Sequence, residues 1–476
     1  MAEIEEARQQ EKAQDMLQHV MRVLKRHKAA WSSGQEPAQP VDIAAYQRSL
    51  GNLQKKLDAT HPADVAYILE ALPQEQRLIV WDLVRPAREG EILLEVSDAV
   101  RESLIASMDS KELVAAAETL EADEIADIAA DLPAGVMEEV VQSLSAEERE
   151  RLRAALSYAE GSVGALMDFD HISVREDSTL EAVTRYLRRL DELPDHTDQL
   201  FVVDRETGLK GTLPLGRLIV SDLHLGVGSV LLPESVKLSP EDRAEDAANA
   251  FERYDLVSAP VVDSRGRLIG RLTVNAVVDY IRQKSAESQR AEAGLAEEED
   301  VFAPVLDSFK NRWSWLAINL VTAFIASRVI GAFEDSIARL VALAALMPIV
   351  AGIGGNSGNQ TITMIVRALA LGQIQGPFWV KLLAKETGLA LLNGVIWGSL
   401  LGAVAYVLYD SVALGGVMAL AMILNLLLAA LMGVTIPWLR ARFGRDPAVG
   451  SSVLITACTD SGGFFIFLGL ATLFLL

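Results

Sequence analysis

The sequence is short of the residues on which most catalytic and structural metal sites depend. It has one cysteine, Cys458, and six histidines, all within the first 224 residues. One cysteine excludes an intramolecular disulfide and a cysteine-rich metal site. The histidines lack the spacing of metal ligands, and no nucleophile–base pair or phosphate-binding loop is recognisable. We therefore do not expect an enzyme.

Basic residues are too few before residue 311 to balance the acidic ones. Residues 311–476 hold 9 Lys+Arg and 6 Asp+Glu, which leaves 34 basic and 59 acidic residues, a net charge of −25, for residues 1–310. An acidic domain repels nucleic acid and attracts cations, so we exclude a nucleic-acid role. The charge fits a solvated acidic surface as well as it fits specific cation binding. A signal peptide is also missing, because Met1–Lys28 lacks an apolar core, and we expect a cytosolic N-terminus.

Long apolar runs appear only after residue 310. Five runs reach or approach the ~20 residues that a helix needs to cross a bilayer: Trp313–Phe333, Ile337–Leu369, Thr387–Tyr409, Ser411–Leu439 and Pro447–Leu476. Basic residues gather in alternate loops, at Lys310 and Arg312, at Arg367, Lys381 and Lys385, and at Arg440, Arg442 and Arg445. By the positive-inside rule this predicts five membrane helices with a cytosolic N-terminus and an external C-terminus.

Two polar features interrupt these apolar runs. Asp460 is the only charged residue of the last run and lies near its middle. A carboxylate at that depth costs roughly 2.5–3.5 kcal/mol on insertion scales, so it normally faces a polar cavity. The second run contains Gly354-Gly355-Asn356-Ser357-Gly358-Asn359-Gln360, whose glycines allow close helix approach and whose amides offer oxygen ligands to a hard cation. Together the two features predict an ion path.

Apolar residues between Leu72 and Leu156 repeat every 24 positions. Three columns keep this register: Leu72, Val96, Leu120 and Leu144; Val80, Leu104, Ile128 and Leu152; and Val84, Met108, Leu132 and Leu156. Such a period is typical of stacked helical hairpins, and we predict an α-helical repeat domain. Within it, Asp123 and Asp127 stand four apart on one helix face, where like charges repel unless a cation or basic partner compensates them. A solvated face is the alternative interpretation.

Short β-rich runs alternate with amphipathic helices from Val163 to Tyr280. Segments 199–213 and 259–273 each contain a strand, a turn with an aspartate and a second strand, which predicts two β-hairpins. The tandem arrangement resembles a pair of cystathionine-β-synthase (CBS) domains, regulatory modules that often bind adenine nucleotides or metal ions. Their nucleotide-binding pattern has Thr and then Asp after the second strand. This chain has Thr273 but Ala276 there, and Pro214 with Arg217 in the first copy, which argues against nucleotide binding.

The order of parts resembles the MgtE-type magnesium transporters. Helical repeats, paired CBS modules, a polar helical connector and five spans follow one another, and the resemblance runs from about His61 to the C-terminus. Its most specific motifs are Met347-Pro348 through Thr361 in the second span, and Asp446-Pro447-Ala448 with Asp460 in the fifth. The resemblance implies a homodimer with its pore on the twofold axis, lined by the second and fifth helices, and a cytosolic domain that senses magnesium and closes the pore.

The resemblance also implies two sets of ion ligands. The pore site would be Asp460 of each subunit, assisted by Asn359 and the backbone at Gly355 and Thr456. Two carboxylates balance the charge of Mg²⁺, and a wide, oxygen-lined site suits an ion that keeps its water. The regulatory positions would be Asp123, Asp127, Asp279 and Glu287. Three further acids of the family are replaced here by Ala276, Lys284 and Ser288, so we predict weaker or shifted magnesium gating.

We therefore predict a multidomain protein of the cell membrane, in contact with lipid and homodimeric. Its parts are an N-terminal helix and linker (1–50), an all-α helical-repeat domain (51–158), α/β tandem CBS domains (159–282), a connecting or plug helix (283–310) and a five-helix transmembrane domain (311–476). The leading function is a gated, passive path for Mg²⁺. The alternatives are an ion-coupled transporter or a channel for other divalent cations, such as cobalt or manganese, and a non-transporting membrane-anchored sensor. An anchor needs neither Asp460 nor the glycine–asparagine motif.

Overall fold

The computed structural model describes residues 2–31, 43–233, 236–295, 298–370, 374, 378–444, 447 and 450–476. Arg445, Asp446 and Ala448, which the sequence analysis used, lie outside the described residues. The chain forms two compact units. The first comprises Met1–Lys284 with Asp300–Ala303, and the second comprises Ser285–Glu299 with Pro304–Leu476.

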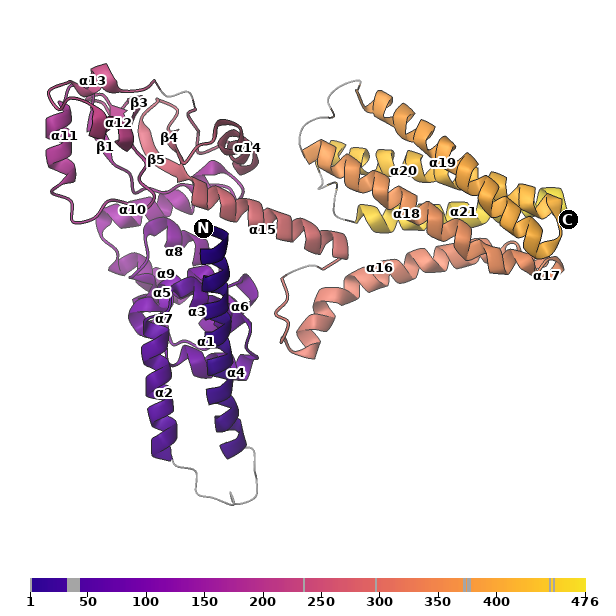
Figure 1. The fold of residues 1–476 in the computed structure, drawn as a ribbon, viewed down its shortest axis with the longest axis horizontal. Helices are drawn as coiled ribbons and strands as arrows, with labels where there is room; N and C mark the ends of the chain where they lie inside the picture. Colours follow the sequence, from indigo (N-terminus) through magenta and orange to yellow (C-terminus); the bar gives the residue numbers. More distant parts are fainter. Residues whose placement is uncertain are drawn as a thin grey trace. The chain divides into compact units, whose positions relative to one another are not determined.

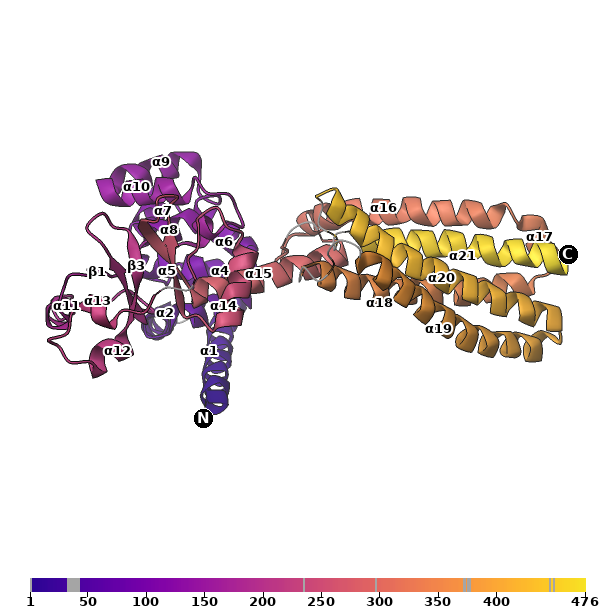
Figure 2. The same ribbon diagram turned by 90° about the horizontal axis from the view of Figure 1, so that it is seen from above.

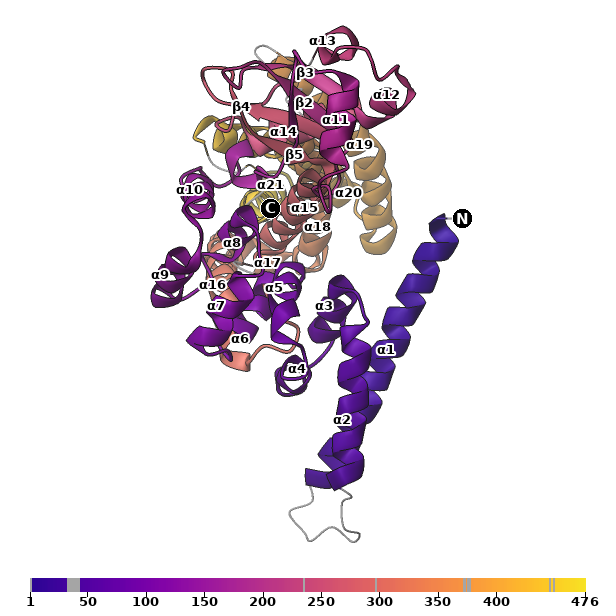
Figure 3. The ribbon, with the colours of Figure 1, turned by 90° about the vertical axis from the view of Figure 1, so that its left-hand side faces the viewer.

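The first unit opens with two long helices, α1 (Ala2–Trp31) and α2 (Ile43–Asp58), which run beside each other (Figure 3). Apolar residues four apart on α2, Leu53 and Leu57, are buried against Val20 and Leu24 of α1. This pair belongs to the same apolar core as the short helices that follow it. The core thus ties the N-terminal helices to the repeat domain.

The repeat domain consists of short helices with a regular spacing. They are α3 (Pro62–Glu70), α4 (Gln74–Trp81), α5 (Pro86–Glu95), α6 (Asp98–Ile105), α7 (Ser110–Ala117), α8 (Ala122–Ile128), α9 (Ala134–Ser143) and α10 (Ala146–Ala155). The helices α4, α6, α8 and α10 begin at residues 74, 98, 122 and 146, which confirms the predicted period of 24. Every residue of the three apolar columns joins the core or packs against it except Leu156, which is 48% exposed where the repeat ends.

A buried arginine holds the first repeats together. Arg77 is 0% exposed, and its guanidinium donates to the carbonyl oxygens of Leu69 (2.9 Å) and Leu72 (3.0 Å) and to Ser103 Oγ (3.1 Å). It also pairs with Asp300 at 2.7 Å. A buried guanidinium is tolerated because its donors and its charge are satisfied. The sequence periodicity did not predict this residue, since it lies outside the apolar columns.

Two α/β modules complete the first unit. The first contains β1 (Ser173–Arg175), α11 (Leu180–Leu187), β2 (Gln199–Val203), β3 (Leu209–Pro214), α12 (Leu215–Val220) and α13 (Val227–Val230). The second contains α14 (Ala244–Tyr254), β4 (Ser258–Val262) and β5 (Leu268–Thr273), and the short 3₁₀ helix η1 (Val163–Leu166) packs into its core. Strands β2 and β3 are antiparallel, as are β4 and β5, which confirms both predicted hairpins, and β1 adds to β2 in parallel.

The helix α15 (Val274–Ala293) continues from β5 without a break and passes from the first unit into the second at Lys284–Ser285. The connecting segment 283–310 is therefore not one helix of its own. Its first part belongs to α15, and its last part belongs to α16, which begins at Val305. The left-handed backbone at Gly294 (φ 78°) ends α15, because a glycine adopts this conformation at no steric cost.

Long helices make up the second unit (Figures 1 and 2). They are α16 (Val305–Gly331), α18 (Ala342–Ala370), α19 (Phe378–Tyr409), α20 (Val412–Arg442) and α21 (Ser451–Leu475), with the short α17 (Glu334–Arg339) before α18. Among the described residues, α16, α19, α20 and α21 are long and apolar enough to cross a membrane. The helix α18 has 29 residues, a sufficient length, but its polar motif lowers its apolar content. The predicted count of five spans therefore stays a prediction.

Candidate functional site

The glycine–asparagine motif of α18 packs closely against α21. A Cβ atom on Gly358 would lie 2.5 Å from the Ile455 side chain, so only a glycine permits this approach. Beside this contact, Ser452 Oγ donates a hydrogen bond to Asn359 Oδ1 at 3.0 Å. The residue numbers fall along α21 as they rise along α18, which makes the two helices antiparallel. The motif thus lies directly beside the helix that carries Asp460.

The four predicted pore residues occupy this pair of helices. Gly355 and Asn359 are four residues apart on α18, and Thr456 and Asp460 are four apart on α21, so each pair shares a helix face. Gly355 is buried, Asn359 and Asp460 are partly buried, and Thr456 is exposed. The carboxylate of Asp460 forms no hydrogen bond or ion pair with any described residue. Within the described part of one copy, its charge is therefore not compensated.

Further polar groups of α18 are exposed in the single chain. Asn356 and Gln360 lie four residues apart and both are exposed. Amide groups that face hydrocarbon lose hydrogen bonds that water or protein would supply. This face of α18 therefore needs either a water-filled path or a second protein surface.

A second carboxylate of the membrane helices was missed by the sequence analysis. Glu386 on α19 is 3% exposed, and Thr361 Oγ1 of α18 donates to its Oε2 at 3.3 Å. The Lys385 ammonium lies 3.3 Å from Oε1 but is not aligned for a hydrogen bond. The apolar run was predicted to begin only at Thr387, whereas α19 begins at Phe378 and includes the acid. Unlike Asp460, Glu386 has partners in its own chain.

A carboxylate cluster lies in the first unit, where α8 lies beside the segment that follows η1 and pairs with β5 of the second α/β module. Single carboxylate oxygens of Glu121, Asp123 and Asp168 all lie within 4.8 Å of one another. Glu121 is the N-cap residue of α8, Asp123 lies in the first turn of that helix, and Asp168 follows η1. Asp168 also pairs at 2.7 Å with Arg271 of β5, which is 4% exposed. Asp123 was predicted from the sequence, but Glu121 and Asp168 were not.

Burial and mutual repulsion raise the pKa values of the carboxyl groups in this cluster. Burial, followed by the charge of Asp168, raises the pKa of Asp123 to about 7. Burial and the charge of Asp170 raise the pKa of Glu121 to about 7. Burial also raises the pKa of Asp168, although the Arg271 guanidinium opposes this shift. A divalent cation among these oxygens would remove the repulsion and favour the ionised forms.

The other predicted regulatory acids lie outside this cluster. Burial raises the pKa of Asp127 to about 6, and the charge of Arg101 opposes that shift, so this acid already faces a cation. Asp279 and Glu287 both lie on α15, Asp279 in the first compact unit and Glu287 in the second. Of the four predicted regulatory acids, the structure places only Asp123 in the group.

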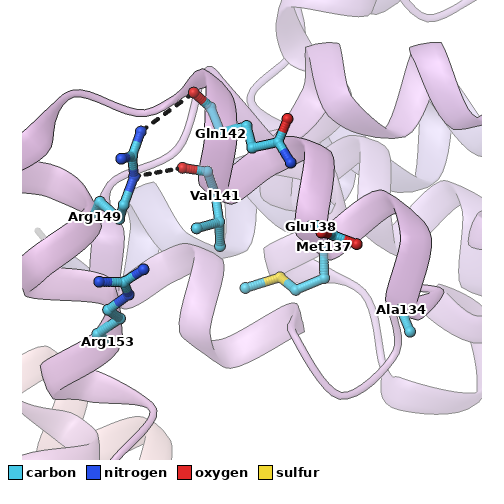
Figure 4. Close-up of a pocket in the computed structure, with 7 residues that line it drawn as sticks. All are labelled: Ala134, Met137, Glu138, Val141, Gln142, Arg149 and Arg153. Carbon is cyan, nitrogen blue, oxygen red and sulfur yellow. Dashed lines mark hydrogen bonds between the residues drawn. The ribbon is translucent and has the colours of Figure 1, made fainter.

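A shallow hollow of about 530 Å³ lies on the repeat domain between α9 and α10 (Figure 4). Met137 and Val141 supply its apolar lining, and Arg149 and Arg153 lie at one side. The Arg149 guanidinium is engaged by the carbonyl oxygens of Val141 and Leu144, which stabilises the end of α9. The hollow contains none of the predicted ion ligands, so it is not part of either candidate site.

Comparison with protein families gives three matches along the chain. Residues 347–470 match the divalent cation transporter model named MgtE, residues 60–161 match the MgtE intracellular N domain, and residues 227–283 match the CBS domain. The match over residues 347–470 includes the motif of α18 and Asp460 on α21.

Curated relatives align along most of the chain. A magnesium transporter MgtE of Thermus thermophilus is 31% identical over 430 residues, covering 89% of this chain and 95% of that protein. The protein of the same name from Bacillus subtilis is 23% identical over 419 residues, covering 88% and 93%. A crystal structure of the cytosolic domain of the Mg²⁺ channel MgtE in complex with ATP is similar with a TM-score of 0.46 and 30% identity, covering 50% of this chain and 98% of that one.

Proposed function

Because the chain belongs to the MgtE family of divalent cation transporters, we propose that it carries Mg²⁺ across a membrane along a path beside α18 and α21. One observation supports this location above the others: Asp460 lies in an apolar helix, next to an amide-bearing helix, with no partner in its own chain among the described residues. An isolated carboxylate in a membrane helix normally faces a polar cavity or an ion pathway. A hydrated Mg²⁺ ion supplies the positive charge that compensates the Asp460 carboxylate.

We propose that two copies of the chain form this path. One Asp460 offers a single negative charge, whereas two balance the charge of Mg²⁺ without leaving a net charge in the membrane. The exposed amides Asn356 and Gln360 on the neighbouring helix gain water or a partner surface in such an assembly. Asn359 and the backbone near Gly355 and Thr456 then line the path as neutral oxygen donors to the hydrated ion.

The first unit is proposed to sense Mg²⁺ on the cytosolic side. Ion binding among Glu121, Asp123 and Asp168 joins α8 of the repeat domain to the segment after η1. The helix α15 connects this unit to the start of α16, and so provides the covalent route for gating. The predictions of weaker gating, from Ala276, Lys284 and Ser288, and of poor nucleotide binding stay predictions. So do the cytosolic N-terminus and the external C-terminus.

The proposal is tested by reconstituting the full chain into liposomes and measuring Mg²⁺ flux under an imposed potential. A potential of 100 mV contributes about 2.3 kcal/mol per charge. Asp460→Asn keeps the shape of the side chain and removes its charge, and we expect flux to fall about 100-fold. The free energy equivalent to this loss is a modest part of the Coulomb attraction between a carboxylate and a divalent ion. Asp410→Asn is the matched control, because Asp410 lies between α19 and α20 with φ of 50°, a conformation that asparagine tolerates.

Each outcome separates one of the competing functions. Unchanged flux in Asp460→Asn would remove this residue from the path. A wild-type protein that carries Co²⁺ or Mn²⁺ in preference to Mg²⁺ would favour the alternative of a channel for other divalent ions. Flux that requires a second ion gradient would indicate coupled transport. A wild-type protein that carries no divalent ion at all would favour a membrane-anchored sensor.

A further inference from the structure

A buried amide on α20 contacts both helices of the proposed path, α18 and α21. Asn425 lies on α20 and is 0% exposed. From Val412 to Val434 it is the only side chain of this helix with a nitrogen or oxygen atom. A lone amide in an apolar membrane helix costs free energy unless a packing or functional contact compensates it.

The carboxamide of Asn425 contacts both α18 and α21 through glycines. On α18, a Cβ atom at Gly354 would lie 2.2 Å from Asn425 Nδ2. On α21, a Cβ atom at Gly463 would lie 2.8 Å from the same nitrogen and 3.0 Å from Asn425 Cγ. Both distances are too short for a real side chain, so each glycine leaves the space that the amide fills.

The amide is also fixed in orientation. Asn425 Nδ2 donates a hydrogen bond of 2.8 Å to the carbonyl oxygen of Val350, one turn before Gly354. Its Oδ1 is buried and has no hydrogen-bond partner among the described residues. The side chain thus satisfies only part of its own hydrogen-bonding capacity, whereas its contacts hold two neighbouring helices.

The two glycines lie close to the proposed ion ligands along each helix. Gly354 directly precedes Gly355, and Gly463 follows Asp460 by three residues, less than one turn. A change in the spacing or rotation of α18 and α21 at these glycines therefore moves the ligands themselves. Binding constellations generally have to be held within about 0.5 Å of their working geometry by the residues that support them.

We propose that Asn425 is a positioning residue for the ion path: its carboxamide sets the spacing of α18 and α21, and thereby the placement of Asn359 and Asp460. This inference deepens the proposed function and depends on it. Asn425 touches no ion in this arrangement and acts through the two helices. It consequently determines which hydrated divalent cation the path accepts, as well as how fast that ion passes.

A pair of substitutions of opposite size tests the contact. Gly463→Ala adds a methyl group where the amide lies, and Asn425→Ala removes the amide. We expect Gly463→Ala to lower Mg²⁺ flux about tenfold, equivalent to about 1.4 kcal/mol. Asn425→Ala should alter the apparent KM for Mg²⁺ and the ratio of Co²⁺ to Mg²⁺ flux. In the double variant the added methyl occupies the vacated space, so flux should recover to the level of Asn425→Ala alone.

The matched control is Gly469→Ala, on the same helix α21, because a Cβ atom there meets nothing within 4 Å. Its flux and ion ratio should equal those of the wild type. Loss of flux in every glycine variant, Gly469→Ala included, would show a general effect on helix α21 and would overturn the proposal. So would an unchanged KM and ion ratio in Asn425→Ala, or a double variant no better than Gly463→Ala.

A second readout keeps this test separate from the transport function. Ser452 and Asn359 contact each other across α18 and α21, so cysteines introduced by Ser452→Cys and Asn359→Cys in a Cys458→Ala background report the spacing through crosslinking with a short bis-thiol reagent. We expect Gly463→Ala to reduce the crosslinking yield and Asn425→Ala to restore it. A yield unaffected by either change overturns the positioning role, whether or not the wild type carries Mg²⁺.

Discussion

The two units of the chain place acidic groups in opposite ways. In the first unit, Glu121, Asp123 and Asp168 are crowded together within one chain, and Arg271 partly compensates them. In the second unit, Asp460 stands alone on an apolar helix. A cluster within one chain suits an ion that binds and stays, because several carboxylates hold it. A single carboxylate per chain suits an ion that passes, because weak, shared binding lets it leave.

The same contrast separates the energetic roles of magnesium in the two units. Binding to a crowded acid cluster stabilises the folded unit in proportion to the logarithm of the free ion concentration, by mass action. Binding near Asp460 changes flux but contributes little to the stability of a helix that the membrane already holds. Measurements of stability should therefore detect the cluster, and measurements of flux should detect Asp460.

The sharpest test of the comparison is the removal of one acid from the cluster. Asp168→Asn takes away the charge that, after burial, contributes most to the raised pKa of Asp123. We expect the Mg²⁺ concentration for half-maximal protection of the full chain against proteolysis to rise about tenfold, which is about 1.4 kcal/mol of lost binding. The matched control is Asp177→Asn, because Asp177 is exposed and pairs with Arg175 outside the cluster.

This experiment also examines the predicted weakness of gating. A protection curve that is sharp and lies at low Mg²⁺ in the wild type would contradict the expectation from Ala276, Lys284 and Ser288. If Asp168→Asn does not change the Mg²⁺ concentration for half-maximal protection, Asp168 is not part of the sensing site. Equal shifts in Asp168→Asn and Asp177→Asn would indicate a general effect of surface charge.

The pH dependence of stability gives a smaller effect with a defined sign. The folded state raises the pKa of Asp123 from 3.8 to about 7, so between roughly pH 4 and 7 the folded chain binds more protons than the unfolded chain. Without Mg²⁺, stability of the first unit should therefore fall as pH rises through this window, by about 1 kcal/mol for Asp123 after allowance for solvent screening. Thermal unfolding of the full chain at pH 5 and pH 7.5 measures the change.

Magnesium should reverse this loss, because it binds the ionised carboxylates. At pH 7.5 saturating Mg²⁺ is expected to raise the midpoint of thermal unfolding, whereas at pH 5 protons occupy the same oxygens and the effect should be small. Asp168→Asn should flatten the pH dependence, since it lowers the repulsion that Asp123 experiences. A midpoint that rises between pH 5 and 7.5 without Mg²⁺ would contradict the assignment of the shifted acids.

The repeating parts of the fold could be predicted from the sequence, whereas individual contacts between residues distant in the sequence could not. The 24-residue columns predicted the repeat domain because the apolar residues of one column occupy equivalent packing positions in successive repeats. Asp460 and the motif of α18 were found because a polar group in an apolar run is conspicuous. Asp168 and Glu121 were missed because they are distant in sequence and meet only in the folded unit. Asn425 was equally conspicuous in its run, but its role depends on Gly354 and Gly463 of two other helices.

Glu386 offers the smallest test and the most direct one, since it is a buried carboxylate within the long helices of the second unit that the comparison must explain. Glu386 is only 3% exposed, yet Thr361 donates to it and the Lys385 ammonium lies beside it. Glu386→Gln keeps an oxygen to accept the Thr361 hydrogen bond, and we expect flux in liposomes to change less than about threefold, on the scale of one neutral hydrogen bond. A loss as large as that of Asp460→Asn would show that partnered and unpartnered acids are equivalent in these helices. The comparison of the two units would then fail, because the lack of a partner would no longer distinguish an acid of the ion path from an acid that only stabilises the surrounding helices.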